Sequence, residues 1–237
     1  MNEQPPRPTI LVGASHGTDN TDGQAVIREL LRRAQQLRPD VQVVEAFVDV
    51  QQPRLVEVLA GLPEDADVVV VPVLLTVGFH TQVDIAEAVA ARPGTSVAAP
   101  LGPDARRSQL LWDRLLEAGG SAEDGVVIAV AGSTAAAAVP RFHELREQFN
   151  GIGGADAVLG YGAALDPRVP AAVDIARRQR PGASVSIASY LLTPGFFHDR
   201  VSGAGADIVA APLGVDDRIA EIILERFDAV VTPAALV

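Results

Sequence analysis

The chain of 237 residues is long enough for one large domain or for two of roughly 110 to 120 residues each. It has no cysteine, which excludes disulfides, thiolate metal sites and iron–sulfur clusters, so a bound metal would need His, carboxylate or water as ligands. Nineteen basic residues, all of them Arg, against thirty acidic ones give a formal net charge of −11, and this charge argues against nucleic acid as a partner.

The chain begins with a polar, Pro-rich segment, Met1 to Pro8, which lacks the basic-then-apolar pattern of an export signal. No later segment approaches the ~18 to 20 uninterrupted apolar residues that a membrane helix requires. We therefore expect a cytoplasmic protein that does not enter a membrane.

The first half alternates short β-branched runs with amphipathic stretches, a pattern typical of βαβ units around a parallel sheet. Val26, Leu30, Leu31, Ala34 and Leu37, for example, follow helical spacing. The pattern predicts strands at residues 9–14, 41–48, 67–75 and 95–99, and helices at 23–37, 53–61, 81–91 and 104–118.

The second half repeats the first, with strands expected at residues 126–130, 155–159, 183–191 and 207–211 and a helix after each. Short motifs recur in the same order and at nearly constant spacing. The recurring pairs are Gly17-Thr18 with Gly132-Ser133, Pro53-Arg54 with Pro167-Arg168, and Ala99-Pro100-Leu101-Gly102 with Ala211-Pro212-Leu213-Gly214. We predict two doubly wound α/β domains with mainly parallel sheets, spanning residues 1–119 and 120–237.

Three potential metal ligands follow the predicted strands of the first half: His16, Asp49 and His80. In open parallel sheets, ligands bind beyond the carboxyl ends of the strands, so these side chains are expected to converge. Two imidazoles and one carboxylate bind first-row divalent metals and leave coordination positions open. The sequence therefore predicts a metal site in the first half.

The second half has lost this set. Ala131 takes the place of His16 in the repeat, and Ala163 takes the place of Asp49. His198 is the counterpart of His80, displaced by one residue through an extra Phe197. The asymmetry predicts one active centre in the molecule, with the second half contributing a wall of the substrate site.

Other readings of these residues are weaker. A single His in a helical stretch, such as His143, is usually a partly buried structural residue, and we interpret it so. The segment from Gly13 to Gly17 has too few glycines for a dinucleotide site, and a chain without Lys has no phosphate-binding Walker lysine. Ser15 has the G-x-S-x-G spacing, from Gly13 to Gly17, and Ser133 does not, but neither has a believable triad partner for a hydrolase nucleophile.

The first half contains three ordered motifs: Val12-Gly13-Ala14-Ser15-His16-Gly17-Thr18, Phe47-Val48-Asp49 before Gln52-Pro53, and Leu74-Leu75-Thr76 with His80 and Asp84-Ile85. Together these motifs resemble the sirohydrochlorin chelatase family, whose members need no ATP. The resemblance implies two domains facing each other across a cleft that holds the macrocycle, with metal on His16, Asp49 and His80. Two positions depart from the family pattern: Thr18-Asp19 replaces a common Ser-Arg pair, and Asp49 replaces a common Glu.

The resemblance implies insertion of Fe²⁺ or Co²⁺, with Ni²⁺ also open, into sirohydrochlorin or a related tetrapyrrole for sirohaem or cobalamin, without an organic cofactor. We expect His16 and His80 to act as metal ligands and proton acceptors. A monomer is expected, because two halves can build the cleft within one chain. A metal or tetrapyrrole carrier that does not catalyse insertion is the alternative. The residues assigned to the substrate carboxylates are Gly17, Thr18, Arg54, Arg168 and Arg200. His198 either contacts the substrate or is a relic of the duplication.

Overall fold

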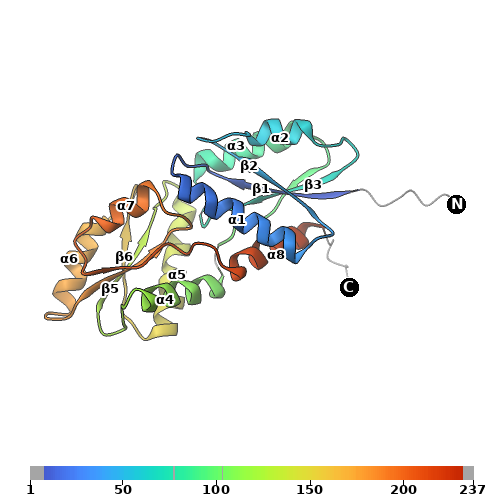
Figure 1. The fold of residues 1–237 in the computed structure, drawn as a ribbon. Coiled ribbons are helices and arrows are strands. Elements are labelled where there is room, and N and C mark those ends of the chain that lie inside the picture. The colour runs from blue at the N-terminus through green and yellow to red at the C-terminus, as the bar shows by residue number, and fades with distance from the viewer. Residues whose placement is uncertain (1–7, 77, 103, 232–237) are drawn as a thin grey trace, which may run out of the picture. The chain divides into compact units, whose positions relative to one another are not determined.

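The computed structural model describes residues 8–76, 78–102 and 104–231, with the backbone alone described at residues 79 and 80 (Figure 1). Strands and helices alternate along the whole chain. The first half contains β1 (Thr9–Ser15), α1 (Thr21–Leu37), β2 (Gln42–Phe47), α2 (Leu55–Gly61), β3 (Asp67–Pro72), α3 (Phe79–Ala90), β4 (Thr95–Val97) and α4 (Ala105–Glu117). The second contains β5 (Gly125–Val130), a 3₁₀ turn (Ala136–Ala138), α5 (Val139–Gly153), β6 (Val158–Tyr161), α6 (Val169–Gln179), β7 (Val185–Tyr190), α7 (Phe196–Ser202), β8 (Ile208–Val209) and α8 (Asp217–Val231).

Each half builds a four-stranded parallel sheet, in the order β2-β1-β3-β4 and β6-β5-β7-β8. The two orders are the same, which confirms the predicted pair of doubly wound α/β repeats. In both sheets the first strand of the repeat is central, and the chain reverses its direction of winding there. Such a reversal leaves a crevice at the carboxyl ends of the strands.

Some element boundaries differ from those expected from the sequence. Strand β3 ends at Pro72 rather than at residue 75, because its neighbour β1 ends at Ser15 and a longer β3 would have no partner. Strand β6 begins at Val158 rather than at 155, because α5 runs on to Gly153 and ends in a left-handed Gly154. A strand partner sets the first boundary and the preceding helix sets the second, and sequence periodicity marks neither.

The chain divides into two compact units whose limits do not follow the two halves. Unit 1 comprises residues 1–19, 27–101 and 217–237, and unit 2 comprises residues 20–26 and 102–216. The helix α4 therefore belongs with the second sheet, and α8 returns to the first. The ranges 1–119 and 120–237 expected from the repeat therefore differ from the two units, because the last helix of each half belongs to the unit built mainly from the other half.

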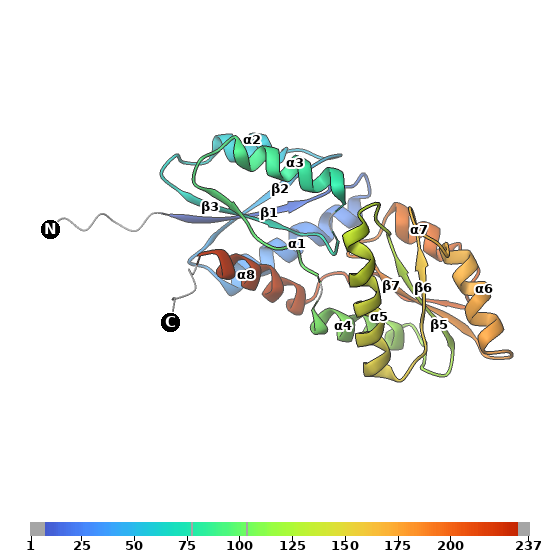
Figure 2. The ribbon, with the colours of Figure 1, turned by 180° about the vertical axis from the view of Figure 1, so that it is seen from behind.

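Unit 1 is a three-layer sandwich. Helices α1 and α8 cover one face of the sheet and α2 and α3 the other (Figures 1 and 2). Alternate β1 residues Ile10, Val12 and Ala14 form a core with α2 and α3, as the two-residue period of a strand requires. On the opposite face, Gly13 lies directly against Leu31 of α1, so a side chain at position 13 would displace this helix.

Unit 2 repeats this arrangement. Helices α6 and α7 cover one face of its sheet and α4 and α5 the other (Figure 1). The core on the α6 side contains Val127, Ala129, Val173 and Ile187. On the other side the fully buried Arg107 lies over the ring of Tyr190, with 5.6 Å between the guanidinium carbon and the ring centroid.

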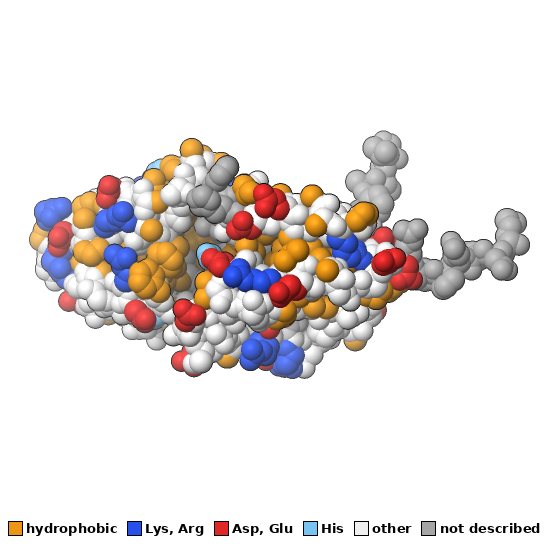
Figure 3. Space-filling view, turned by 90° about the horizontal axis from the view of Figure 1, so that it is seen from above, with side chains coloured by type: hydrophobic (Ala, Val, Ile, Leu, Met, Phe, Trp, Pro, Cys, Tyr) orange, Lys and Arg blue, Asp and Glu red, His pale blue; other side chains and the backbone are white. Residues whose placement is uncertain are grey.

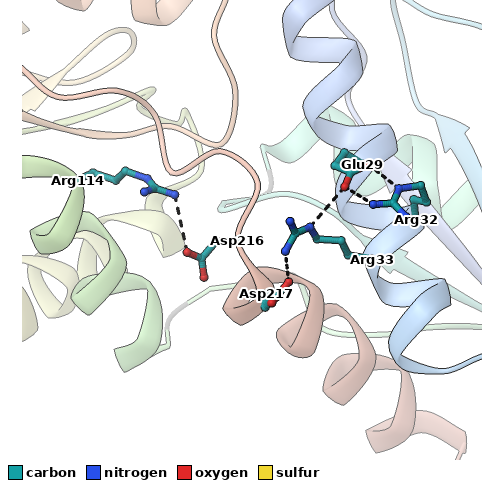
Figure 4. A network of polar contacts seen from close by, with 6 residues as sticks. All are labelled: Glu29, Arg32, Arg33, Arg114, Asp216 and Asp217. Carbon is teal, nitrogen blue, oxygen red and sulfur yellow. Dashed lines mark hydrogen bonds and ion pairs between the residues drawn. The ribbon is translucent and has the colours of Figure 1, made fainter. Parts of the chain in front are cut away.

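Two consecutive acidic residues mark the point where the chain passes from unit 2 to unit 1 (Figure 4). Asp216 pairs with Arg114 of α4 at 3.7 Å, within unit 2. Asp217 begins α8 and pairs with Arg33 of α1, within unit 1. Arg33 also lies 3.4 Å from Glu29, which pairs with Arg32. Each side of the crossing is therefore attached to its own unit.

The face in Figure 3 carries acidic and basic side chains interspersed, with hydrophobic atoms between them. On this face the cations are individual Arg side chains and do not merge into a basic field. Of the helices in the described part of the chain, none is both long and apolar enough to cross a membrane.

Candidate metal centre

His16 and Asp49 lie at the carboxyl ends of the neighbouring strands β1 and β2. His16 directly follows β1, and Asp49 lies two residues beyond the end of β2. Backbone hydrogen bonds continue the pairing past both strands: Val48 N–H donates to Ser15 O and Asp49 N–H donates to His16 O, each at 2.9 Å. The two candidate ligands are thus held side by side by the backbone itself.

A tight turn fixes the backbone after Asp49. Gln51 N–H donates to Asp49 O at 2.5 Å, across Val50, whose φ of 56° lies in the left-handed region. A β-branched residue rarely adopts this region, so the turn is strained. The Gln51 side chain closes the arrangement, because its Oε1 accepts the Thr18 N–H at 2.9 Å.

Gly17 is required where the two loops cross. Its φ is 94°, and a Cβ at this position would clash with the carbonyl oxygen of Asp49. Only glycine satisfies both the backbone conformation and the close approach. The Gly after His16 therefore serves the geometry of the site.

The Asp49 carboxylate is exposed and already has a cationic partner. Arg54 Nη1 donates to Asp49 Oδ1 at 3.1 Å and to Val48 O at 2.9 Å. The pKa of Asp49 is lowered chiefly because the Val50 backbone N–H donates to the carboxylate, while Arg54 and His16 add favourable charge. Asp49 is therefore ionised and available as an oxygen ligand at neutral pH.

The third candidate, His80, lies in the first turn of α3, one residue inside its start. The sequence placed it ahead of the helix, which begins two residues earlier than expected. Its side chain lies outside the described part of the structure. Among the side chains that are described, no three His, Cys, Asp or Glu residues form a group that could hold a metal, a statement that leaves His80 aside.

The structure thus brings His16 and Asp49 together, with Gly17, Thr18 and Arg54 around them. An imidazole and a carboxylate that lie at the carboxyl ends of neighbouring strands and are open to solvent can ligate a first-row divalent ion and leave some of its coordination positions free. Such an open site suits an ion that enters and leaves. A closed structural site would need all four ligands from the protein.

Unit 2 contains the same loops without the ligands. Ala163 N–H donates to Ala131 O at 2.8 Å, Leu165 N–H donates to Ala163 O at 2.8 Å, and Ala164 has a φ of 65°. Gly132 has a φ of 90°, and a Cβ there would clash with Ala163 O. These backbone hydrogen bonds match those of unit 1 one for one. The predicted equivalence of Ala131 with His16 and of Ala163 with Asp49 is therefore confirmed.

The other expected substrate contacts, Arg168, His198 and Arg200, belong to unit 2. Arg168 Nη1 donates to Gly162 O at 3.1 Å, as Arg54 does to Val48 O. Arg200 lies over the exposed ring of Phe196, 5.4 Å from its centroid. His198 Nε2 lies 3.3 Å from Ala210 O, which gives this ring a partner in the backbone of its own unit.

The start of α7 revises the repeat alignment at His198. Both α3 and α7 follow a glycine, so Phe197 takes the second helical position, which His80 occupies in α3. His198 takes the third, and one residue turns a side chain by about 100° around a helix. Ala131, Ala163 and Phe197 therefore replace the whole predicted ligand set by apolar residues.

His143 is exposed on α5, although the sequence favoured a partly buried residue. Helix α5 turns its buried face through Phe142, Leu145 and Phe149, and position 143 lies off that stripe. His143 is far along the chain from the metal site and lies in the other unit.

Sequence reasoning missed Val50 and Gln51. The repeat carries Ala164 and Leu165 at these places, so comparing the two halves gave no signal for a polar brace. The importance of Val50 and Gln51 in the segment Asp49-Val50-Gln51-Gln52-Pro53 becomes visible only in the structure, through the turn that this segment forms.

Comparison with known proteins agrees with this description. The family model CbiX matches residues 10–118. No curated protein sequence matches the chain. The fold is similar to that of SirB from Bacillus subtilis with Fe³⁺, with a TM-score of 0.77 and 17% identity over 93% of this chain and 94% of that one.

Two further solved structures are similar in the same way. One is the sirohydrochlorin chelatase SirB from Bacillus subtilis subspecies spizizenii in complex with cobalt (TM-score 0.75, 15% identity, 92% of this chain and 93% of that one). The other is CbiX, the terminal enzyme of siroheme biosynthesis in denitrifying bacteria (TM-score 0.67, 18% identity, 95% and 100%). At these identities the likeness is one of fold. The residues matched by the CbiX family model, 10–118, include His16, Asp49 and His80.

Proposed function

We propose that this protein inserts Fe²⁺ or Co²⁺ into sirohydrochlorin or a closely related tetrapyrrole, with the metal bound by His16, Asp49 and His80. The observation that carries the proposal is the contrast between the two repeats. Both have the same loop architecture, and only unit 1 has His and Asp where unit 2 has Ala131 and Ala163. Because the potential ligands are present in one repeat and absent from the matching loops of the other, we infer a single metal centre, which lies in unit 1.

The chemistry requires a metal that can be released and a base that can accept protons. A free-base macrocycle loses two pyrrole N–H protons as the ion enters its centre. A neutral imidazole accepts protons near physiological pH, so His16 and His80 are suited to this role. Asp49 contributes an ionised oxygen ligand that is held in place by the turn at Val50. Positioning the ion beside the ring supplies the entropic part of the catalysis.

The carboxylates of the substrate would meet individual cations and backbone donors, because the chain has a net charge of −11. Arg guanidinium groups bind carboxylates in bidentate geometry. Arg168 and Arg200 stay the predicted candidates in unit 2, and Gly17 stays one in unit 1. The Thr18 N–H, which was also expected to meet the substrate, already donates to Gln51 Oε1. His198 is a weaker candidate, since its ring nitrogen already faces Ala210 O.

The test is anaerobic, absorbance-monitored metallation of excess sirohydrochlorin with Fe²⁺ or Co²⁺. His16→Ala and His80→Ala should lower the rate by roughly 100-fold or more, the usual contribution of a catalytic acid or base. His143→Ala is the matched control, because it removes an exposed His from unit 2 and should keep the wild-type rate.

The outcomes separate the alternatives. Turnover of many equivalents, lost in the first two variants and kept in the control, supports the chelatase. Tight stoichiometric binding of metal or tetrapyrrole without turnover would show a carrier instead. Binding of neither would leave a regulatory module and overturn the proposal.

A further inference from the structure

The Asp49–Arg54 pair suggests how the site avoids holding its metal too tightly. We propose that Arg54 is a positioning residue that competes with the metal for the Asp49 carboxylate and thereby keeps the ion transferable. The inference rests on the proposed function of the site. It replaces the expected role of Arg54 as a contact for substrate carboxylates.

The geometry gives one nitrogen two tasks. Arg54 Nη1 contacts Val48 O at 2.9 Å and Asp49 Oδ1 at 3.1 Å. The Arg54 backbone is itself fixed at the start of α2, because its N–H donates to Glu57 Oε2 at 3.1 Å and to Gln52 Oε1 at 3.0 Å. The guanidinium therefore stands at one oxygen of the proposed metal ligand, on a side chain whose backbone is fixed at the start of α2.

Comparison with Arg168 in unit 2 distinguishes the contact with the carbonyl oxygen from the contact with the carboxylate. Arg168 keeps the contact with the strand-end carbonyl, Gly162 O, at 3.1 Å. It faces Ala163 where Arg54 faces Asp49, and its nearest carboxylate is instead Asp166, with 3.7 Å between Nε and Oδ1. Bracing the carbonyl is thus common to both repeats, whereas pairing with a candidate metal ligand occurs in unit 1, where that ligand stands.

Two other carboxylates line the same hollow as the Arg54 side chain. A hollow of about 440 Å³ between α2 and α3 is lined by Arg54 together with Asp84 and Glu87. When a divalent ion takes the Asp49 carboxylate, the guanidinium can turn toward these carboxylates and remain compensated. The exchange costs little, because the Arg54 and Asp49 side chains are both substantially exposed, at 39% and 60%.

A cation beside a metal ligand weakens metal binding in two ways. It occupies one oxygen of the carboxylate, and it repels the incoming ion. A chelatase gains from this weakening, since an ion bound too firmly in the ground state is slow to reach the macrocycle.

The experiment is calorimetric titration of the full-length chain with Co²⁺ alone, followed by single-turnover transfer of Co²⁺ to sirohydrochlorin. Arg54→Gln keeps a hydrogen-bonding side chain and removes the charge. We expect it to bind Co²⁺ about fivefold more tightly, which corresponds to an exposed ion pair, and to transfer the ion more slowly by a similar factor. Arg54→Lys restores a cation and should return both values toward wild type.

Arg168→Gln is the matched control for Co²⁺ affinity, because it removes the equivalent Arg from the repeat that lacks the ligands. Unchanged or weaker Co²⁺ binding in Arg54→Gln would overturn the inference. A raised KM for sirohydrochlorin with unchanged Co²⁺ affinity would return Arg54 to the substrate. The proposed function fails separately if the wild type does not bind Co²⁺, or if His16→Ala leaves Co²⁺ binding unchanged.

Discussion

At the scale of single residues, Gly17 is the position where the metal site is most sensitive. Ala at this position would place a Cβ against Asp49 O and would have to adopt a φ of 94°. We expect Gly17→Ala to lower the free energy of unfolding by about 2–4 kcal/mol and to abolish Co²⁺ binding, because the loops carrying His16 and Asp49 must separate. Urea unfolding and Co²⁺ titration measure the two effects.

Gly132→Ala tests whether the effect on metal is local. Gly132 has the same conformation and the same close contact in unit 2. A similar loss of stability with Co²⁺ affinity retained would locate the metal effect at Gly17. Equal loss of Co²⁺ binding in both variants would mean that general destabilisation, rather than the site geometry, explains the result.

The placement of His16 and Asp49 side by side could be predicted from sequence because its signal is local. His16 and Asp49 follow β-branched runs, and parallel strands end at one edge of a sheet. The Arg54 contact could not be predicted, because it depends on a turn at Val50 that brings the start of α2 back to the end of β2. A positive φ at a β-branched residue contradicts local preference, so sequence rules point away from this turn.

At the scale of elements, strands and helices were predicted well where periodicity is strong and less well where neighbours decide. The helix α1 stands as expected, because its apolar stripe packs on the sheet. The end of β3 is set by its strand partner β1, and the start of β6 is set by α5, which directly precedes it and runs on to Gly153. Periodicity reports which face is buried, and it carries no information about where the partner stops.

The packing of α1 on β2 includes one unfavourable carboxylate. Glu45 on β2 is 24% exposed and lies 3.9 Å from Arg28 of α1, and its Oε1 is buried with no hydrogen-bond partner among the described residues. Burial raises the pKa of Glu45. Because the folded-state pKa of this acid lies above the unfolded value, stability is lost as pH rises through that range and stays lost above it.

We therefore expect Glu45→Gln to raise the free energy of unfolding at pH 7 by on the order of 1 kcal/mol. The gain should be smaller at pH 4, which lies below even the ordinary pKa of Glu, because the raised pKa leaves Glu45 itself protonated there. Urea unfolding at both pH values measures it. A variant that is less stable at pH 7, or whose gain does not depend on pH, would show that Arg28 compensates the charge fully.

At the scale of the whole molecule, the repeat was visible in sequence and the exchange of its last helices was not. The motifs that recur mark loops and strand ends, which keep their place in each half. Helices α4 and α8 are amphipathic, and this pattern does not indicate which of the two sheets each helix covers. The connections around Leu101 and Asp216 decide this by leading each helix into the other unit.

The exchange predicts how the chain behaves when it is divided. A fragment of residues 1–119 would expose Leu110, Leu111 and Leu115 of α4, which are fully buried in unit 2, and would lack α8. The corresponding buried residues of α8 are Ile219, Ile222 and Ile223. Burying each such side chain contributes about 1.5–3 kcal/mol, so three of them approach the entire stability of a typical domain, about 5–15 kcal/mol.

Fragment 1–119 should therefore unfold without a cooperative transition, as followed by circular dichroism in urea. A chain in which residues 8–101 are joined through a flexible linker to residues 217–231 keeps α8 on its own sheet and should unfold cooperatively. Mixing fragments 1–119 and 120–237 should restore a cooperative transition, since each supplies the helix that the other lacks. If 1–119 alone unfolded at the midpoint of the intact chain, the halves of the repeat would be the folding units and the exchanged helices would contribute little to stability.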